Sequence, residues 1–236
     1  MTTWYFGADL GTTSNPCGMS FYIGRMGYGT TVSIDWHVTS TSIPAFAYWN
    51  IVGPGGASGS TIADFQAWGA AQADAFWNQF WNQQYPGGYP GNTMFGAISQ
   101  GSGGWNTAND STAWSQNQAV VEGFLNELAS KNAANSFSSS TTLGLYGNQV
   151  SEWETLLNGK NWTSPQPIVV WTADPQSSTD CTTVEGLYCP MPTLGGYFPM
   201  IWQYHGDPDY DVTPYSGGVD KSSNYTWHPV SPPGIC

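Results

Sequence analysis

Short apolar segments alternate along this chain with longer stretches in which apolar side chains recur at helical spacing. Strands are predicted over 4–10, 20–26, 43–52, 94–98, 142–146, 168–172, 198–204 and, shorter, 218–221. In 63–85 and 112–131 the apolar positions recur every three or four residues, the spacing of a helix with one buried face. A short third helix is predicted over 150–157.

Strands that alternate with helices predict right-handed βαβ units and a mainly parallel sheet. The chain has 236 residues, and a single (β/α) barrel typically has ~250. We see neither a linker nor an internal repeat. We therefore predict one α/β domain over 1–236, an irregular (β/α) TIM-type barrel in which some helices are short or missing. A doubly wound open sheet is the alternative, but no GxGxxG or P-loop pattern follows the first strand.

The charge of the chain limits the classes of molecule that it is expected to bind. Charged residues are 8% of the total, against roughly 25% in an average soluble protein, and the net charge is -12. Such a surface repels a phosphate backbone and an anionic bilayer, so neither nucleic acid nor a membrane is expected as a partner. No apolar run approaches the ~20 residues of a transmembrane helix.

Metal and cofactor motifs are not recognisable. The chain has no CxxC pair and no His at ligand spacing, which argues against zinc. Asp207, Asp209 and Asp211 alternate in an acidic segment that lacks the Gly and the distal Glu of an EF-hand. We interpret this segment as a solvated loop, with a calcium site as the alternative, and expect no metal or cofactor.

The chain has an even number of cysteines and few lysines, which indicates an oxidising compartment. Of the three possible pairings we favour Cys181–Cys189 and Cys17–Cys236, and four buried thiols are the alternative. The N-terminus lacks the basic region and apolar core of a signal peptide, as a mature form with an added Met would. We expect a secreted, extracellular protein.

The carboxyl ends of the predicted strands carry mostly aromatic, amide and carboxylate side chains. In a barrel these ends form the ligand site. The chain has 13 Trp and 13 Tyr; their flat faces suit the C–H faces of sugars, while amides and carboxylates suit sugar hydroxyls. This pattern predicts a polysaccharide or glycan as the partner, and the alternative is that the rings are core. The candidate binding residues are Arg25, Tyr48, Trp49, Trp105, Tyr146, Trp171, Gln203 and Tyr204.

Several segments, in the right order, resemble glycoside hydrolase family 25, the barrel lysozymes. YFGADLGTT is similar to the first strand of that family, FYIGRM to the second and IPAFAYWNIV to the third. The fifth strand of that family and the strands after it are similar to four further segments of this chain, LGLYGNQVSEWETLL, VVWTADP, MIWQYH and SGGVDKSSNY. The resemblance implies a barrel that acts on cell-wall polysaccharide, with Asp9 and Asp220 matching site acids on the first and last strands.

The fourth strand, in MFGAISQGSGGW, departs from the family. There the family has Asp-x-Glu, with the Glu as proposed general acid, whereas this chain has Ala97-Ile98-Ser99. Glycoside hydrolysis normally needs two carboxyl groups, and the loss of a general acid costs ~10²–10⁴ in rate. No other acid lies between Asp74 and Asp110 along the chain. Asp9 and Asp220 remain as an improvised acid/base pair.

Three functions follow from these observations. The first, which we favour, is a secreted relative of the barrel lysozymes that binds glycan with little or no hydrolysis. The second is an active glycoside hydrolase that uses Asp9 and Asp220, or a variant whose acid pair was replaced to stop turnover. The third is a structural or surface-coat glycoprotein. The sequence indicates no oligomeric state.

Overall fold

The structure is a computed structural model that describes residues 5–9, 21–34, 45–82, 93–134, 141–162, 169–173, 201–205 and 209–213. Its helices are α1 (Ile62–Asn82), α2 (Ser111–Ala134) and the short α3 (Thr155–Leu157). Single turns η1 (Pro54–Gly56) and η2 (Gln100–Ser102) follow strands, and the π-helical segment η3 (Gln149–Glu154) leads into α3. The predicted helices are therefore confirmed, with ends that differ by a few residues.

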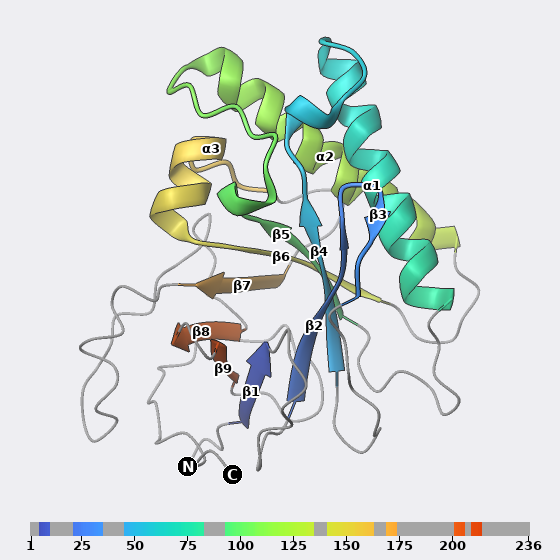
Figure 1. Ribbon diagram of the computed structural model, residues 1–236, viewed down its shortest axis with the longest axis vertical. Helices are drawn as coiled ribbons and strands as arrows, with labels where there is room; N and C mark the ends of the chain where they lie inside the picture. The colour runs from blue at the N-terminus through green and yellow to red at the C-terminus, as the bar shows by residue number, and fades with distance from the viewer. Residues whose placement is uncertain are drawn as a thin grey trace.

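Nine strands are described (Figure 1). They are β1 (Tyr5–Asp9), β2 (Phe21–Tyr28), β3 (Thr31–Val32), β4 (Ala45–Ile51), β5 (Thr93–Ile98), β6 (Thr142–Gly147), β7 (Val169–Ala173), β8 (Ile201–His205) and β9 (Asp209–Thr213). Seven of them confirm predicted strands, and β3 was not predicted. The expected strand at 218–221 lies outside the described residues.

The interpretation of the acidic segment as a loop was wrong at Asp209 and Asp211, because both lie in β9. Tyr210 and Val212 alternate with these acids, and this two-residue period is typical of a strand. Only residues 206–208 separate β9 from β8, a connection short enough for an antiparallel hairpin.

The predicted mainly parallel sheet is confirmed. β2, β4, β5, β6, β7 and β8 form successive parallel pairs in that order. β9 is antiparallel to both β8 and β1, β1 is parallel to β2, and β3 is antiparallel to β2. The protein is thus of mixed α/β class, as the alternation of strands and helices predicts.

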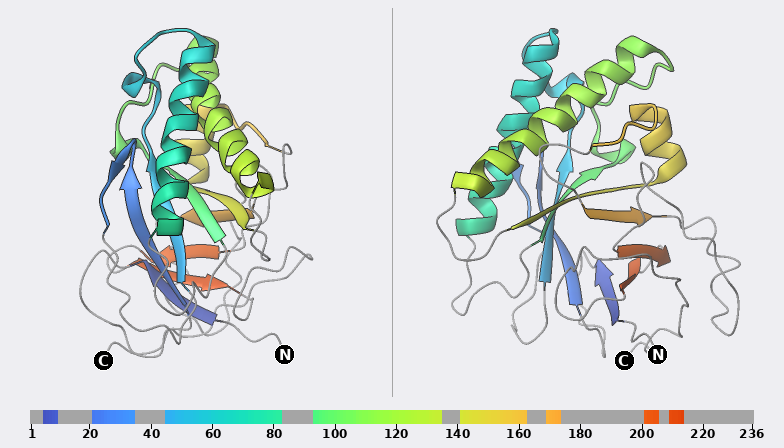
Figure 2. Two further views of the ribbon diagram at one scale, coloured as in Figure 1. Left: turned by 90° about the vertical axis from the view of Figure 1, so that its right-hand side faces the viewer. Right: turned by 180° about the vertical axis from the view of Figure 1, so that it is seen from behind.

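The larger core lies between the sheet and the pair α1 and α2, which cover one side of it (Figure 2). The Trp49 ring stacks on Phe76 with 5.5 Å between ring centroids, and Phe76 lies 6.3 Å from Phe124 of α2. All three side chains are fully buried. Burying each apolar side chain of this size contributes about 1.5–3 kcal/mol to folding, so this layer holds the helices to the sheet.

Helices α1 and α2 touch backbone to backbone at two glycines. A Cβ on Gly69 of α1 would overlap the carbonyl oxygen of Val120, and one on Gly123 of α2 would overlap the carbonyl oxygen of Gln66. Beyond this crossing, Lys131 of α2 pairs with Asp74 of α1. No helix in the described ranges has the length and apolarity needed to cross a bilayer.

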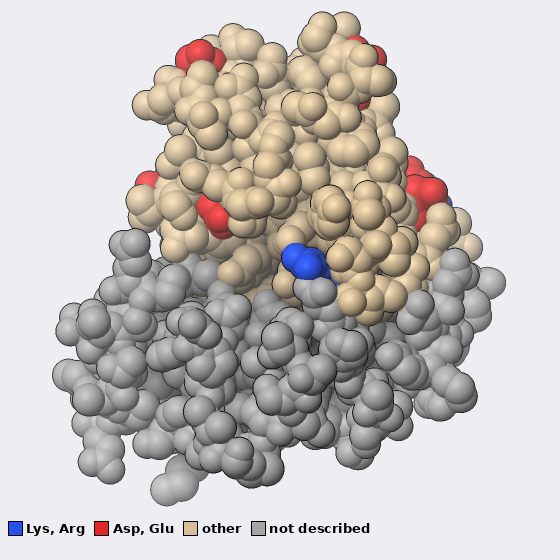
Figure 3. Space-filling view, viewed as in Figure 1, with Lys and Arg blue, Asp and Glu red and all other residues tan. Residues whose placement is uncertain are grey.

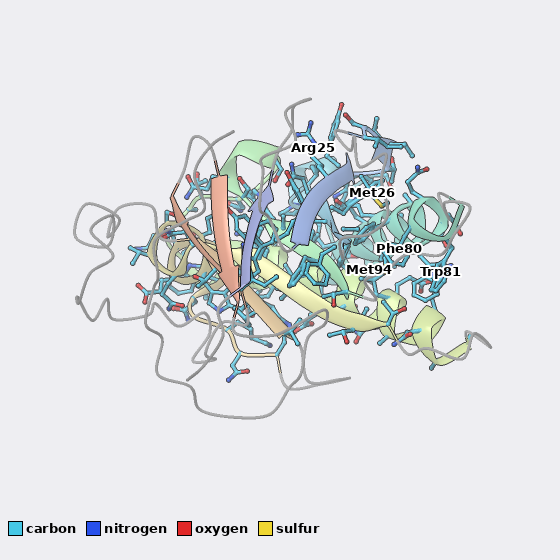
Figure 4. All side chains as sticks on the ribbon, turned by 90° about the horizontal axis from the view of Figure 1, so that it is seen from below. Arg25, Met26, Phe80, Trp81 and Met94 are labelled. Atoms are coloured by element: carbon cyan, nitrogen blue, oxygen red, sulfur yellow. The ribbon has the colours of Figure 1, made fainter. Side chains whose placement is uncertain are left out.

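A second, smaller core cluster involves the alternate positions of the same strands. It contains Ile23, Phe46, Phe95, Val169, Trp171 and Ile201, and the partly buried Tyr48 and Tyr146 pack against it. Successive strand residues point to opposite faces, so this cluster lies on the sheet face away from α1 and α2. In Figure 4, Phe80 and Met94 lie close together near α1, and Met26 belongs to the same core cluster.

Candidate functional site

Three predicted binding residues meet on the sheet face away from α1 and α2. The Trp171 ring centroid lies 4.0 Å from that of Tyr146 and 5.7 Å from that of Tyr48. Trp171 is fully buried, while both tyrosines are partly exposed. We call these three residues the aromatic cluster. Trp171 is therefore a buried ring in contact with two partly exposed tyrosines.

The strands bring these rings together through their register. Tyr48 of β4 pairs with Phe95 of β5, which pairs with Gly144 of β6, and Tyr146 of β6 pairs with Trp171 of β7. A Cβ on Gly144 would collide with the Phe95 ring. The glycine therefore gives Phe95 the room to pack edge-on against Trp171, with 5.6 Å between their ring centroids.

Two predicted binding residues lie in the core instead. Trp49 follows Tyr48 in β4, so strand alternation turns it toward the helices, where its indole N–H donates to the carbonyl of Gly29 at 2.8 Å. Trp105 is buried against the core, and its indole N–H donates to the carbonyl of Ser99 at 2.8 Å. Neither ring is offered to a ligand, so we leave both out of the candidate site.

Arg25, the single arginine of the chain, lies in β2 and pairs in register with Tyr48. Its side chain is partly buried, and an irregularity in the strand pairing separates it from Gly27. Charged side chains are sparse on the described part of the face that Figure 3 shows. Arg25 thus places a cation one strand away from the aromatic cluster.

Three further predicted residues are placed only by strand pairing. Gln203 of β8 pairs with Ala173 and with Asp211, and Tyr204 lies at the irregularity between β8 and β9. Asp9 of β1 pairs with Ile23 and with Asp209. Asp220, Cys17, Cys181, Cys189 and Cys236 lie outside the described residues, so the Asp9/Asp220 pair and the two disulfides stay predictions.

The two positions of the degenerate motif lie at the end of β5. Ala97 is fully buried and pairs in register with Asn50 and Tyr146. Ser99 caps η2, where its hydroxyl accepts from the N–H of Gly101 at 3.2 Å. Neither side chain carries a titratable group, so β5 itself brings no acid to this edge.

The turn after β5 is braced against the turn after β4. The N–H of Gly53 donates to the carbonyl of Gly103 at 3.0 Å, and that of Gly55 to the carbonyl of Gly104 at 2.7 Å. A Cβ on Gly53 would lie 2.5 Å from the Cα of Trp105, and Gly104 has a φ of +73°. The Ser102 hydroxyl is within hydrogen-bond distance of the carbonyls of Ile51 (2.8 Å) and Ser99 (2.6 Å).

An acid that the sequence did not reveal lies beside Ser99. One carboxylate oxygen of Glu152 in η3 accepts from the N–H of Gln100 at 3.2 Å, and the other accepts from the N–H of Asn148 at 2.8 Å. The Ser99 hydroxyl lies close enough to the same carboxylate to lower its pKa. Burial raises the pKa of Glu152 above its ordinary value, although the contacts with Asn148, Gln100 and Ser99 act in the opposite direction. We call Ser99, Gln100, Asn148 and Glu152 the polar rim.

The polar rim is positioned by the start of η3. Asn148 follows β6 and caps η3, because its side-chain oxygen accepts from the N–H groups of Val150 at 3.0 Å and Ser151 at 2.9 Å. The cap turns the chain so that Glu152 reaches back to β5. The sequence signal for this arrangement is an Asn at the end of a strand with a Glu four residues later. This signal does not show which strand the Glu contacts.

The described residues contain no group of three or more His, Cys, Asp or Glu arranged to hold a metal ion. The chemistry that this edge offers is therefore hydrogen bonding by hydroxyl, amide and carboxylate groups next to aromatic faces. Comparisons with protein-family models, curated proteins and solved structures find no match for this chain. The structure itself defines the class, an α/β protein with a mainly parallel sheet.

Proposed function

We propose that this protein binds glycan at the aromatic cluster and polar rim, with little or no hydrolysis. The observation that carries the proposal is the pair of partly exposed tyrosines, Tyr48 and Tyr146, supported by Trp171. Asn148 follows Tyr146 by two residues, and Ser99 follows its register partner Ala97 by two. Two strand residues span about 6.6 Å, close to the width of one sugar ring, so stacking and hydroxyl contacts are available to the same sugar.

The proposal includes the fold that the sequence suggested, an irregular TIM-type barrel formed by a single domain. The strand pairings support it, because β1 pairs with both β2 and β9, and β9 also pairs with β8. In such a barrel, ligands bind at the carboxyl ends of the parallel strands. The polar rim lies at the carboxyl ends of β5 and β6.

The absence of a carboxyl group at Ala97 and Ser99 is the reason for proposing binding over cleavage. Hydrolysis normally uses two carboxyl groups that flank the scissile bond. In the polar rim Glu152 is the single acid, and its two oxygens already accept backbone N–H groups. A secreted, disulfide-bonded form belongs to the same proposal and is supported by the cysteine count and the scarcity of lysine.

The test is a titration of the purified protein with cell-wall oligosaccharides and chitooligosaccharides, in which binding is measured by calorimetry and by tryptophan fluorescence. Reducing ends are assayed in parallel. We expect saturable binding without the release of reducing ends. Tyr146→Ala should weaken binding about tenfold or more, which corresponds to 1.4 kcal/mol.

The matched control is Tyr28→Ala, which removes an exposed tyrosine of β2 outside the aromatic cluster and should leave the affinity unchanged. Equal affinity of the wild type and Tyr146→Ala would refute the proposed site. If the wild type releases reducing ends and Asp9→Asn does not, the protein is a hydrolase and the proposal of binding with little or no hydrolysis is wrong. Ordered self-association without glycan binding would favour a structural role.

A further inference from the structure

Glu152 joins segments that are far apart in the sequence. Its carboxylate accepts from Gln100, 52 residues away, and from Asn148 at the end of β6. A second tie runs beside it, because the side-chain N–H of Gln100 donates to the carbonyl of Ser151 at 2.6 Å. The turn after β5 is therefore attached to η3 by one contact that includes an ionisable group and by one that does not.

The geometry around Glu152 matches its ionised form. Both backbone N–H groups are donors, and the Ser99 hydroxyl, which accepts from Gly101, lies beside the carboxylate and lowers its pKa. An ionised carboxylate only accepts, whereas a protonated one carries a donor of its own. Protonation therefore weakens these contacts, because a neutral carboxyl group accepts hydrogen bonds less strongly than an ionised one.

We propose that Glu152 is the positioning residue of the polar rim: its ionised carboxylate holds Ser99 and Gln100 in the geometry that receives sugar hydroxyls, so glycan affinity falls when this carboxylate is protonated. The part of this inference that concerns affinity rests on the proposed glycan-binding function. The part that concerns the hydrogen bonds of Glu152 with Gln100 and Asn148 is testable without any ligand.

The described surroundings of Glu152 contain no cation that would fix its charge. The turn after β5 contributes the neutral Ser99 and Gln100, and the end of β6 and the residue after it contribute Gly147 and Asn148. On η3 itself, Glu154 accepts from the side chain of Gln149 at 3.0 Å. Burial is thus the dominant influence on the pKa of Glu152 and moves it upward.

Affinity and stability should respond to acid in opposite directions at this residue. A carboxyl whose pKa is raised by folding makes the fold less stable once it ionises, so its contribution to stability falls as the pH rises from the unfolded to the folded pKa. Acidification through that window relieves this cost and at the same time weakens the hold on Ser99 and Gln100. A purely structural role predicts no loss of affinity in the same window.

The experiment compares the full-length wild type with Glu152→Gln and, as matched control, Glu154→Gln on the same segment. Affinity for the tightest-binding chitooligosaccharide is measured between pH 4 and pH 8, together with unfolding midpoints. We expect the affinity of the wild type to fall about fivefold or more on acidification. Glu152→Gln should bind at the weak, acidic level throughout, and Glu154→Gln should follow the wild type. Wild-type affinity and pH profile in Glu152→Gln would overturn the proposal.

Hydrogen exchange of the Gln100 and Asn148 amides provides a ligand-free readout. Protection of at least one of these amides should fall with acid in the wild type and be low at all pH values in Glu152→Gln. If exchange ignores both the pH and the substitution, the positioning role is wrong whether or not glycan binds. If exchange responds but no glycan binds at any pH, the proposed function fails, while the role of Glu152 in holding Gln100 and Asn148 stands. Should Glu152→Gln not fold, Ser99→Ala removes one donor and should give a partial loss of affinity with the pH step retained.

Discussion

The contact of α1 with α2 through Gly69 and Gly123 allows a sharp prediction about stability. In most helix interiors, replacing Gly by Ala stabilises a protein by roughly 0.5–1 kcal/mol, because Ala loses less backbone entropy on folding. At Gly123 the added methyl group would overlap the carbonyl oxygen of Gln66. Backbone atoms have no rotamer by which to move away, so the two helices must separate.

The size of the effect follows from these opposing contributions. Overpacking of a well-packed contact typically costs about 1–3 kcal/mol, and more where the backbone must move. Separation of the helices also loosens the layer in which Phe76 meets Phe124. After the gain in helix propensity is subtracted, we expect Gly123→Ala to lower the free energy of unfolding by about 2 kcal/mol. For a chain of this length that corresponds to a fall of about 4–8 °C in the unfolding midpoint.

The assay is urea unfolding followed by circular dichroism, with Asn126→Ala at an exposed position of α2 as control for helix propensity. Gly69→Ala should behave like Gly123→Ala, because its methyl group would overlap the carbonyl of Val120. One displacement of the helices relieves both overlaps, so the double variant should cost less than the sum of the two. A Gly123→Ala protein as stable as the wild type would refute the close approach of the helices.

Two further predictions concern polar groups that hold the elements in place. Asn117 is fully buried, accepts from the N–H of Asn106 and donates to the carbonyls of Asn106 and Leu156; Asn117→Ala should therefore destabilise the protein by about 2–4 kcal/mol in urea unfolding, and an unchanged midpoint would contradict this network. At the start of α1, hydrogen bonds from the Thr61 side chain and then its backbone hold the pKa of Asp64 below its ordinary value. A lowered pKa contributes stability above the unfolded pKa that is lost as the pH falls through the folded pKa; Asp64→Asn should thus be less stable than the wild type at pH 7, with a difference that shrinks toward pH 3, and a difference independent of pH would argue against this carboxylate.

Most elements of the fold were predictable because each has a local pattern. The helical spacing in 63–85 and 112–131 marks α1 and α2, and the apolar runs mark most of the strands. The error at β9 arose because Asp209 and Asp211 were interpreted by their charge alone. Their alternation with Tyr210 and Val212 was the better signal.

The candidate site was predictable only in part, because the pattern of a strand buried on both sides does not show which residue faces which layer. Tyr48 and Trp49 are adjacent aromatic residues in β4, and the sequence treats them alike. The structure places one in the aromatic cluster and the other against Phe76. Glu152 escaped detection for another reason, since its partner Gln100 is 52 residues away and no local pattern records that distance.

The brace between the turns that follow β4 and β5 has a consequence for how this edge can evolve. It is made by backbone groups of glycines and by the Ser102 hydroxyl, which donates to the carbonyl of Ile51. Substitutions at Gly53 and Gly104 should be selected against, while the side chain at position 99 can change with less effect on the path of the backbone. The backbone path of this edge can therefore persist while the side chain at position 99 changes by a point substitution, with no insertion or remodelling of the loop.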